Sequence, residues 1–204
     1  MNELELLDWK RHVFELYAGV RAAPDPAQAW GHWCAARDEL FRTHPQSPIP
    51  AAERSAFGGL VYFPYDPALR VVAAIEPAAE ETRDIAGSAG SVTRFRRFGQ
   101  TQLELAGARH ELELYWLEAY GGGVFLPFGD ATGGTETYGG GRYLLDTVKG
   151  SDLGGDHGSL VLDFNFAYNP SCSYDPRWAC PLTPPANRLP VEIRAGERHR
   201  GSAV

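Results

Sequence analysis

The chain has 204 residues, of which 44% are hydrophobic and 22% are charged, proportions that are typical of a folded domain and exclude wholesale disorder. Nineteen Lys and Arg residues against 26 Asp and Glu residues give a formal charge of −7 at pH 7. This acidic balance argues against a nucleic-acid-binding protein and against a protein that binds anionic lipid by charge. Neither a membrane-spanning apolar run nor an export signal is found in the sequence. We therefore expect a soluble cytoplasmic protein with no membrane partner.

Two amphipathic helices are predicted at the start of the chain. The first carries apolar side chains at spacings of three and four residues, namely Leu6, Trp9, Val13, Leu16 and Val20. Asp25 followed by Pro26 marks the N-terminus of a second helix, which ends near His44 because Pro45 disfavours helical geometry in the residue before it. One side of that helix holds Trp30, Trp33, Cys34, Arg37, Leu40 and Phe41. Residues 1–44 are therefore expected to form a helical hairpin that buries this aromatic side against the rest of the chain.

From residue 60 onward apolar residues alternate with polar ones, and glycines separate the alternating segments. The segments predicted to be strands span residues 60–64, 71–75, 91–98, 102–105, 111–117, 124–128, 142–147, 159–166 and 191–194. Short strands joined by Gly turns are typical of an antiparallel β-sandwich or β-barrel. We therefore expect a mainly β fold, α+β overall, in which residues 45–204 form an antiparallel β domain. The prolines after His44 make a rigid connector, so hairpin and β domain are expected to form one compact unit.

A Gly-rich segment at residues 128–144 contains three candidate ligand-binding residues, Asp130, Thr132 and Arg142. A phosphate-binding loop ends in Gly-Lys-Ser/Thr before a helix, whereas here Arg142 opens a predicted strand, so that interpretation is rejected as the leading one. Positive φ angles in a long turn explain the glycines better. The Arg142 guanidinium can bind a carboxylate, either on a ligand or on Asp130 or Asp163. For Thr132, capping of the turn is favoured over contact with a ligand.

Polar residues also occur inside a predicted strand. The apolar side chains alternate over residues 160–167, which places Asp163 and Asn165 together on the opposite face. Both residue types are depleted in strands, so the pair lies in solvent, lines a cavity or anchors neighbouring loops. The pattern alone favours the solvated alternative.

The cysteines give a weaker signal. An odd number of cysteines, three in this chain, argues against a secreted disulfide framework. Cys172 and Cys180 are expected to be buried thiols, a local disulfide or a redox pair, because the ligand spacings of a zinc site do not accompany them. The motifs of α/β-hydrolases, dinucleotide-binding domains and zinc proteases are also missing from the sequence. The sequence therefore predicts no metal site and identifies no cofactor.

Seven short segments carry a resemblance to a known family. They read THPQSPI at 43–49, GLVYFP at 59–64, GRYL at 141–144, LDFNFAYNP at 162–170, CPL at 180–182, NRL at 187–189 and AGE at 195–197. Together they resemble the bacterial family called domain of unknown function 1684, which implies no established reaction, cofactor or partner. The polar residues at the family's signature positions are Asp130, Thr132, Tyr138, Arg142, Asp163, Asn165, Asn169, Cys172, Tyr174, Cys180 and Asn187.

These observations lead to a hypothesis in which a cavity of the β domain binds a small polar or anionic metabolite. The residues expected to face that cavity are Asp130, Thr132, Tyr138, Arg142, Asp163, Asn165 and Asn169. If the protein is an enzyme, Asp163 is the general base, Tyr138 is the proton donor and Arg142 holds a negative group. The alternatives are a binding protein without catalysis, and a structural or interaction protein in which Cys172 and Cys180 help to lock a C-terminal loop over the sheet.

Overall fold

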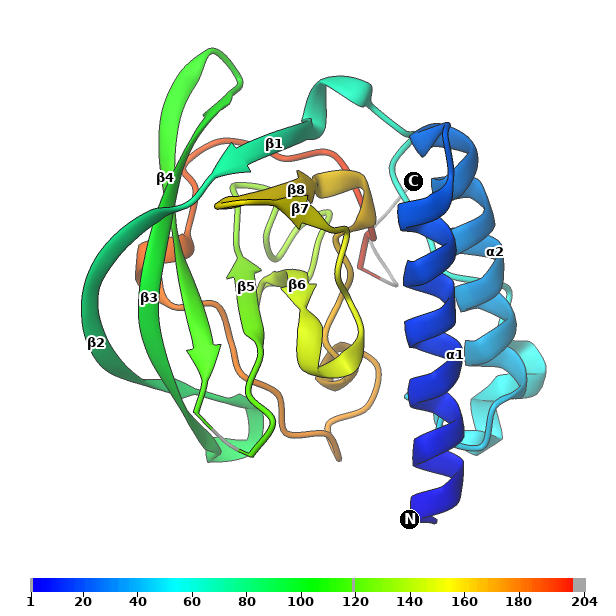
Figure 1. The fold of residues 1–204 in the computed structure, drawn as a ribbon. Helices are drawn as coiled ribbons and strands as arrows, with labels where there is room; N and C mark the ends of the chain where they lie inside the picture. Colours follow the sequence, from blue (N-terminus) through cyan, green and yellow to red (C-terminus); the bar gives the residue numbers. More distant parts are fainter. Residues whose placement is uncertain (1, 119, 200–204) are drawn as a thin grey trace.

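The computed structural model describes residues 2–118 and 120–199, and its N-terminal part is a pair of antiparallel helices (Figure 1). Helix α1 spans Glu3–Ala22 and helix α2 spans Pro26–Thr43. Asp25 begins α2 as predicted, because its side chain accepts hydrogen bonds from the backbone N–H groups of the second and third helical residues. Helix α2 ends directly before His44, so the predicted stop before Pro45 is also confirmed.

The β domain consists of two antiparallel sheets that pack against each other. The larger sheet has the strand order β2-β3-β4-β5-β6, with β2 at Glu76–Ala86, β3 at Val92–Leu105, β4 at Ala108–Leu117, β5 at Val124–Phe128 and β6 at Arg142–Asp146. The smaller sheet has the order β1-β8-β7, with β1 at Arg70–Ala74, β7 at Gly155–Asp156 and β8 at Ser159–Asp163. The described strands do not close into a barrel, so the sandwich alternative is confirmed.

The main hydrophobic core lies between the two sheets. Leu112 and Leu114 of β4 are fully buried there, together with Phe128 of β5 and Leu162 of β8. A second cluster joins the hairpin to the β domain, because Trp33 of α2 packs edge-on against Phe166 with their ring centres 5.2 Å apart. The helical hairpin therefore covers the side of the sandwich next to β6 and β8 (Figure 1).

One strand is longer than the sequence predicted. Residues 91–98 and 102–105 belong to the single strand β3, because the chain passes through Gly99 with a bulge in the pairing to β4 rather than with a turn. A side chain at this position would not fit, since a Cβ atom on Gly99 would lie 2.9 Å from the Ile75 side chain. Gly99 therefore allows the close contact with Ile75 and does not end a strand.

Three other strand predictions were wrong in part or whole. The strand predicted for 159–166 ends at Asp163, whose side chain accepts a hydrogen bond from Asn165 N–H and starts a 3₁₀ turn. Residues 60–64 make one isolated bridge, Tyr62 to Glu197, and residues 191–194 belong to no strand. In contrast, β2 was missed because its many charged residues resemble a solvated loop. Its charges pair across the sheet edge, as with Asp84 and Arg94 at 2.9 Å.

No helix in the described ranges is both long and apolar enough to cross a membrane.

Candidate functional site

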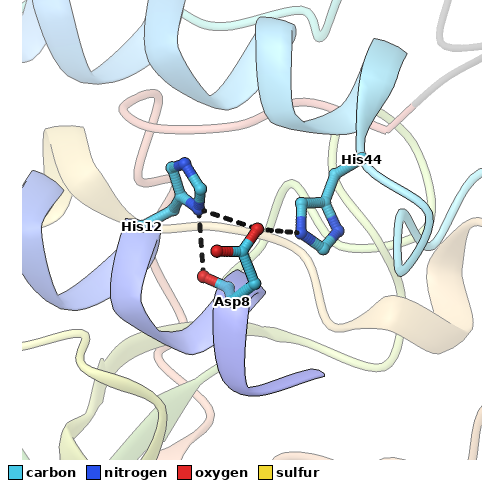
Figure 2. A group of neighbouring side chains, drawn as sticks. All are labelled: Asp8, His12 and His44. Carbon is cyan, nitrogen blue, oxygen red and sulfur yellow. Dashed lines mark hydrogen bonds and ion pairs between the residues drawn. The ribbon is translucent and has the colours of Figure 1, made fainter. Parts of the chain in front are cut away.

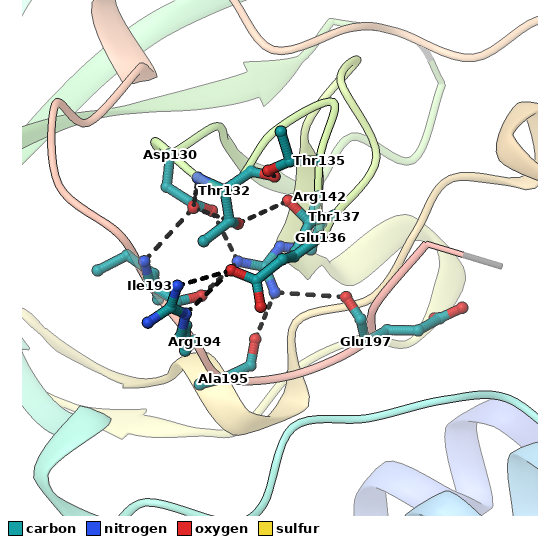
Figure 3. A network of polar contacts seen from close by, with 10 residues as sticks. All are labelled: Asp130, Thr132, Thr135, Glu136, Thr137, Arg142, Ile193, Arg194, Ala195 and Glu197. Carbon is teal, nitrogen blue, oxygen red and sulfur yellow. Dashed lines mark hydrogen bonds and ion pairs between the residues drawn. The ribbon is translucent and has the colours of Figure 1, made fainter. Parts of the chain in front are cut away.

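Arg142 and Asp130 form a buried ion pair behind the Gly-rich loop (Figure 3). Arg142 Nη2 lies 2.7 Å from Asp130 Oδ2, and each side chain is 1% exposed. The same guanidinium donates hydrogen bonds to the backbone carbonyls of Ile193, at 2.9 Å, and Ala195. The sequence predicts Asp130 or Asp163 as the internal partner of Arg142, and the structure shows that the partner is Asp130. This arrangement ties the Gly-rich loop to residues 193–197, which we call the C-terminal segment.

Thr132 lies in the tight turn that follows Asp130 (Figure 3). Its hydroxyl is 2.5 Å from Asp130 Oδ1 and 2.8 Å from the hydroxyl of Thr137. Its carbonyl accepts hydrogen bonds from the backbone N–H groups of residues 135, 136 and 137. Thr132 therefore holds the turn together from within.

Asp163 and Asn165 also pair with each other. Asp163 Oδ1 accepts hydrogen bonds from the backbone N–H of Asn165 at 3.0 Å and from its side-chain amide at 2.8 Å. Tyr65 donates to the second carboxylate oxygen at 3.3 Å, and Arg70 Nε lies 3.7 Å from it. Burial raises the pKa of the Asp163 carboxyl, an effect that these hydrogen bonds oppose.

The Asn165 side chain continues this network to the turn that precedes β1. It donates to the carbonyl of Asp66 and accepts from the N–H of Asp66, both at 2.8 Å. Both polar groups of the amide are therefore used within the protein. Five of the seven residues that were expected to face one cavity form separate contacts: Asp130 with Arg142, Asp163 with Asn165, and Tyr138 with Cys172, where Tyr138 Oη lies 3.6 Å from Cys172 Sγ.

A second buried ion pair joins the hairpin to the C-terminal segment. Arg37 Nη2 of α2 donates to Glu197 Oε2 at 2.9 Å, and its Nη1 donates to the hydroxyl of Tyr62 at 2.7 Å. The Arg37 guanidinium also lies 4.6 Å from the centre of the Trp33 ring. Glu197 is fully buried and accepts a further hydrogen bond from the hydroxyl of Tyr174.

Asn169 connects this ion pair to the turn after β8. Its backbone N–H donates to Glu197 Oε2 at 3.1 Å, and its side-chain amide donates to the carbonyl of Arg198 at 2.9 Å. Among the residues that the structure describes, none offers a hydrogen bond to Asn169 Oδ1, although that atom is buried. The side chain therefore retains one unused acceptor.

A cavity of about 90 Å³ lies between the helical hairpin and the β domain. The hairpin contributes, among other side chains, the aromatic rings of Trp9, Tyr17 and Trp33 and the guanidinium of Arg37. The β domain contributes Tyr143, Lys149, Ser151, Tyr168 and Asn169. Asn169 is the one sequence-predicted ligand-binding residue in this wall, and we call the space the hairpin cavity.

The charged residues in the described wall of the hairpin cavity are both cationic. Arg37 is held by Glu197, and Lys149 Nζ lies 3.0 Å from Asp146 Oδ2. Neither Glu197 nor Asp146 belongs to the wall, so each carboxylate pairs with its cation from outside the cavity. The described wall therefore combines aromatic faces with two cationic side chains, each of which already pairs with a carboxylate outside the wall.

Asp8, His12 and His44 form the one cluster in the described residues whose ligand atoms are close enough for a metal ion (Figure 2). Asp8 Oδ2 lies 3.3 Å from His44 Nε2 and 3.6 Å from His12 Nδ1. His44 Nδ1 accepts a hydrogen bond from the backbone N–H of Gln46 at 3.0 Å, so the ring proton is on Nε2 and faces Asp8. The Asp8 carbonyl oxygen, which can only accept, lies 3.0 Å from His12 Nδ1, so a hydrogen bond there needs a proton on Nδ1. A metal ion would need a free lone pair on His44 Nε2 and on His12 Nδ1, where the hydrogen bonds place protons. The cluster therefore fits a hydrogen-bonded contact between α1 and the end of α2, and not a metal site.

The sequence contained only indirect signals for the hairpin cavity. Arg37 is a charged residue on the aromatic side of a predicted helix, which is unusual unless a buried carboxylate pairs with it. Glu197 stands in the segment AGE, and Lys149 follows β6 in a turn. Lys149 pairs with Asp146 three residues before it, but Arg37 and Glu197 are 160 positions apart, so no spacing pattern could have joined those two.

Comparisons with known proteins agree with this fold. The family model for a protein of unknown function, DUF1684, matches residues 55–198. The solution NMR structure of an uncharacterized protein from Haloarcula marismortui is 33% identical and covers 84% of this chain and 92% of its own, with a TM-score of 0.59. No curated protein matches the chain. The protein therefore belongs to the DUF1684 family.

Proposed function

We propose that this protein binds a small organic anion in the hairpin cavity. The observation that carries the proposal is the charge of the wall, where Arg37 and Lys149 are present and no described lining residue is acidic. Arg37 is buried and already pairs with Glu197, so the partly exposed Lys149 is the cation that is more open to a ligand. Asn169 contributes a polar side chain to the wall, which suits a ligand that carries hydrogen-bonding groups.

The size of the cavity limits the ligand to a small molecule. An apolar cavity of ~150 Å³ accepts benzene, so a cavity of about 90 Å³ suits a molecule with fewer atoms. A short-chain hydroxy carboxylate combines a negative charge, a hydroxyl donor and a small apolar part. We therefore infer that this chemical class fits the wall best.

The proposal assigns supporting roles to most of the sequence-predicted site residues. Asp130 and Arg142 tie the Gly-rich loop to the C-terminal segment, and Asp163 and Asn165 hold the turn before β1. Asp163 and Tyr138 lie outside the wall of the hairpin cavity. The proposal therefore contains a binding step and no acid–base step.

Ligand-observed NMR with glycolate, lactate and their neutral amides tests the proposal. We expect both carboxylates to bind, and the amides to bind at least about tenfold more weakly, because one lost charge interaction of ~1.4 kcal/mol corresponds to that factor. Equal binding of amide and acid would contradict an anion site. The variant Lys149→Gln should weaken lactate binding, whereas Lys10→Gln removes the same charge from α1 outside the wall and should not.

A structural protein without a ligand is the competing function. Its support is that the carboxylates of Asp130, Asp163 and Glu197 all have partners inside the protein. Native mass spectrometry of freshly purified protein separates the two functions, since a bound metabolite adds mass that disappears on denaturation. A clean native mass together with no binding of lactate or glycolate would favour the structural function.

A further inference from the structure

Two of the three cysteines lie in the part of the chain that follows β8. The thiols of Cys172 and Cys180 lie close enough to affect each other's ionisation, and both are free. Cys180 is buried, whereas Cys172 is partly exposed. A small reagent can therefore reach Cys172 first, with Cys180 directly behind it.

The backbone holds Cys180 in a fixed place. Its N–H donates to the hydroxyl of Ser88 at 2.9 Å, and its carbonyl accepts from the N–H of Ser88 at 2.9 Å. Ser88 belongs to the turn between β2 and β3, so Cys180 is anchored on the larger sheet. Cys172 instead lies on the short 3₁₀ turn Ser171–Ser173, and an S–S bond requires its sulfur to come within ~2.05 Å of the Cys180 sulfur.

The surroundings of Cys172 stabilise a thiolate. Tyr138 Oη lies 3.6 Å from Cys172 Sγ, and the hydroxyl of Ser88 also contacts this sulfur. Hydrogen bonding from the Cys180 thiol is the main cause that lowers the pKa of Cys172 to about 6, and Cys180 correspondingly keeps its proton, with a raised pKa. Burial raises the pKa of Cys34 in α2 to about 12, so the third thiol has the opposite character.

We propose that Cys172 and Cys180 are a peroxide-sensitive dithiol pair, in which Cys172 is the attacking thiolate and Cys180 is the resolving thiol. The Cys172 sulfur attacks one oxygen of a hydroperoxide, the O–O bond breaks, and the leaving oxygen takes a proton to become water or an alcohol. Cys172 is then a sulfenic acid. The Cys180 sulfur attacks the Cys172 sulfur and loses its proton, the S–O bond breaks, and the hydroxyl leaves with that proton as water while the disulfide forms. Two thiols are oxidised and one peroxide is reduced.

Hydrogen peroxide is the probe for this proposal. The reduced full-length protein receives one molar equivalent of peroxide at pH 7 and is then denatured and treated with N-ethylmaleimide. We expect the product to carry one maleimide, on Cys34, and to have lost two hydrogens. Trypsin cleaves after Arg177, between the two cysteines, so the disulfide appears as a cross-linked pair of peptides. Three maleimides per chain, or a disulfide that includes Cys34, would overturn the proposal.

Variants separate the two roles. In Cys180→Ser the reaction should stop at the sulfenic acid of Cys172, which dimedone traps. In Cys172→Ser we expect oxidation of the remaining thiols to be at least about tenfold slower. Cys34→Ser is the matched control and should form the disulfide at the wild-type rate. An equal rate in Cys172→Ser and wild type would show that Cys172 is not the attacking thiol.

A measurement on the wild-type protein is independent of how the variants fold. The rate of Cys172 alkylation by iodoacetamide, followed by peptide mass, should rise with pH through a midpoint near 6. Tyr138→Phe removes one hydrogen-bond donor and should move this midpoint upward. A wild-type midpoint at the ordinary value for cysteine would contradict the proposal.

Discussion

Arg37 and Glu197 join the helical hairpin to the C-terminal end of the β domain through a buried ion pair. Arg37 Nη2 lies 2.9 Å from Glu197 Oε2, and the two side chains are 9% and 0% exposed. The two residues are 160 positions apart in the sequence. Tyr62 and Tyr174 complete the hydrogen bonds of the two charges. The pair lies at the hairpin cavity, because Arg37 is part of its wall.

Removal of one partner of this pair should destabilise the protein strongly. Glu197→Gln leaves the Arg37 guanidinium buried without a counter-charge, so we expect the free energy of unfolding in urea to fall by about 3–5 kcal/mol. Glu192→Gln is the matched control, because Glu192 is exposed and pairs with Arg194 in solvent. A loss in Glu197→Gln no larger than in the control would contradict a buried pair.

Arg142 should act on stability and not on ligand affinity. The hypothesis that Arg142 holds a negative group of a ligand predicts instead a variant that keeps its fold and loses its ligand. Arg142→Met leaves Asp130 without its cation and three backbone carbonyls without their donor, so the free energy of unfolding should fall by about 3–5 kcal/mol. Urea unfolding measures this change, with Arg194→Met at an exposed ion pair as the control. Wild-type stability in Arg142→Met would show that the buried pair contributes little.

Asp163 should make the stability depend on pH in a defined direction. Burial raises the pKa of this carboxyl in the folded protein, while Tyr65 and Arg70 face it and favour the charged form. The folded state therefore binds the proton more tightly than the unfolded state. This contribution to stability is complete below the unfolded pKa and is lost as pH rises through the raised folded pKa.

The variant Asp163→Asn removes that dependence. Its other structural effects are the same at every pH, so its stability relative to wild type should improve between about pH 4 and about pH 7. Urea unfolding of both proteins across this range gives the difference. A constant difference, or one that changes in the opposite direction, would show that the Asp163 pKa is not raised.

Gly196 permits the close approach of the C-terminal segment to the turn after β8. Its φ angle is +74°, and a Cβ atom there would lie 2.5 Å from the carbonyl oxygen of Ala167. Gly196→Ala should therefore lower the free energy of unfolding by more than about 1 kcal/mol. Gly58→Ala is the matched control, since nothing lies within 4 Å of its Cβ position. Equal thermal stability of the two variants would contradict this role.

Elements with a local cause could be predicted from the sequence. The start of α2 follows from Asp25 and Pro26, and its end from Pro45, because capping and proline geometry act within a few residues. β2 could not be predicted in this way. Its charged residues become a strand only when β3 supplies partners such as Arg94, and that pairing is a property of the folded sheet.

The candidate site was predictable only in part. The sequence predicts Asp130 or Asp163 as an internal partner for Arg142, since a guanidinium binds a carboxylate, and the structure places Asp130 there. Glu197 could not be assigned to Arg37, because only the folded chain brings the last segment against α2. The hairpin cavity arises from the same long-range packing, so its wall residues share no sequence motif.

The most direct test of the anion site fills the hairpin cavity. Val13 lines it from α1, and Val13→Phe adds a ring where the ligand is proposed to lie. Val92→Phe is the matched control at an exposed position at the start of β3. Trp9 and Trp33 lie in the wall, so their fluorescence reports a titration with lactate. We predict saturable binding to wild type and Val92→Phe, with at least about tenfold weaker binding to a folded Val13→Phe. Equal affinity in all three proteins would contradict binding in this cavity.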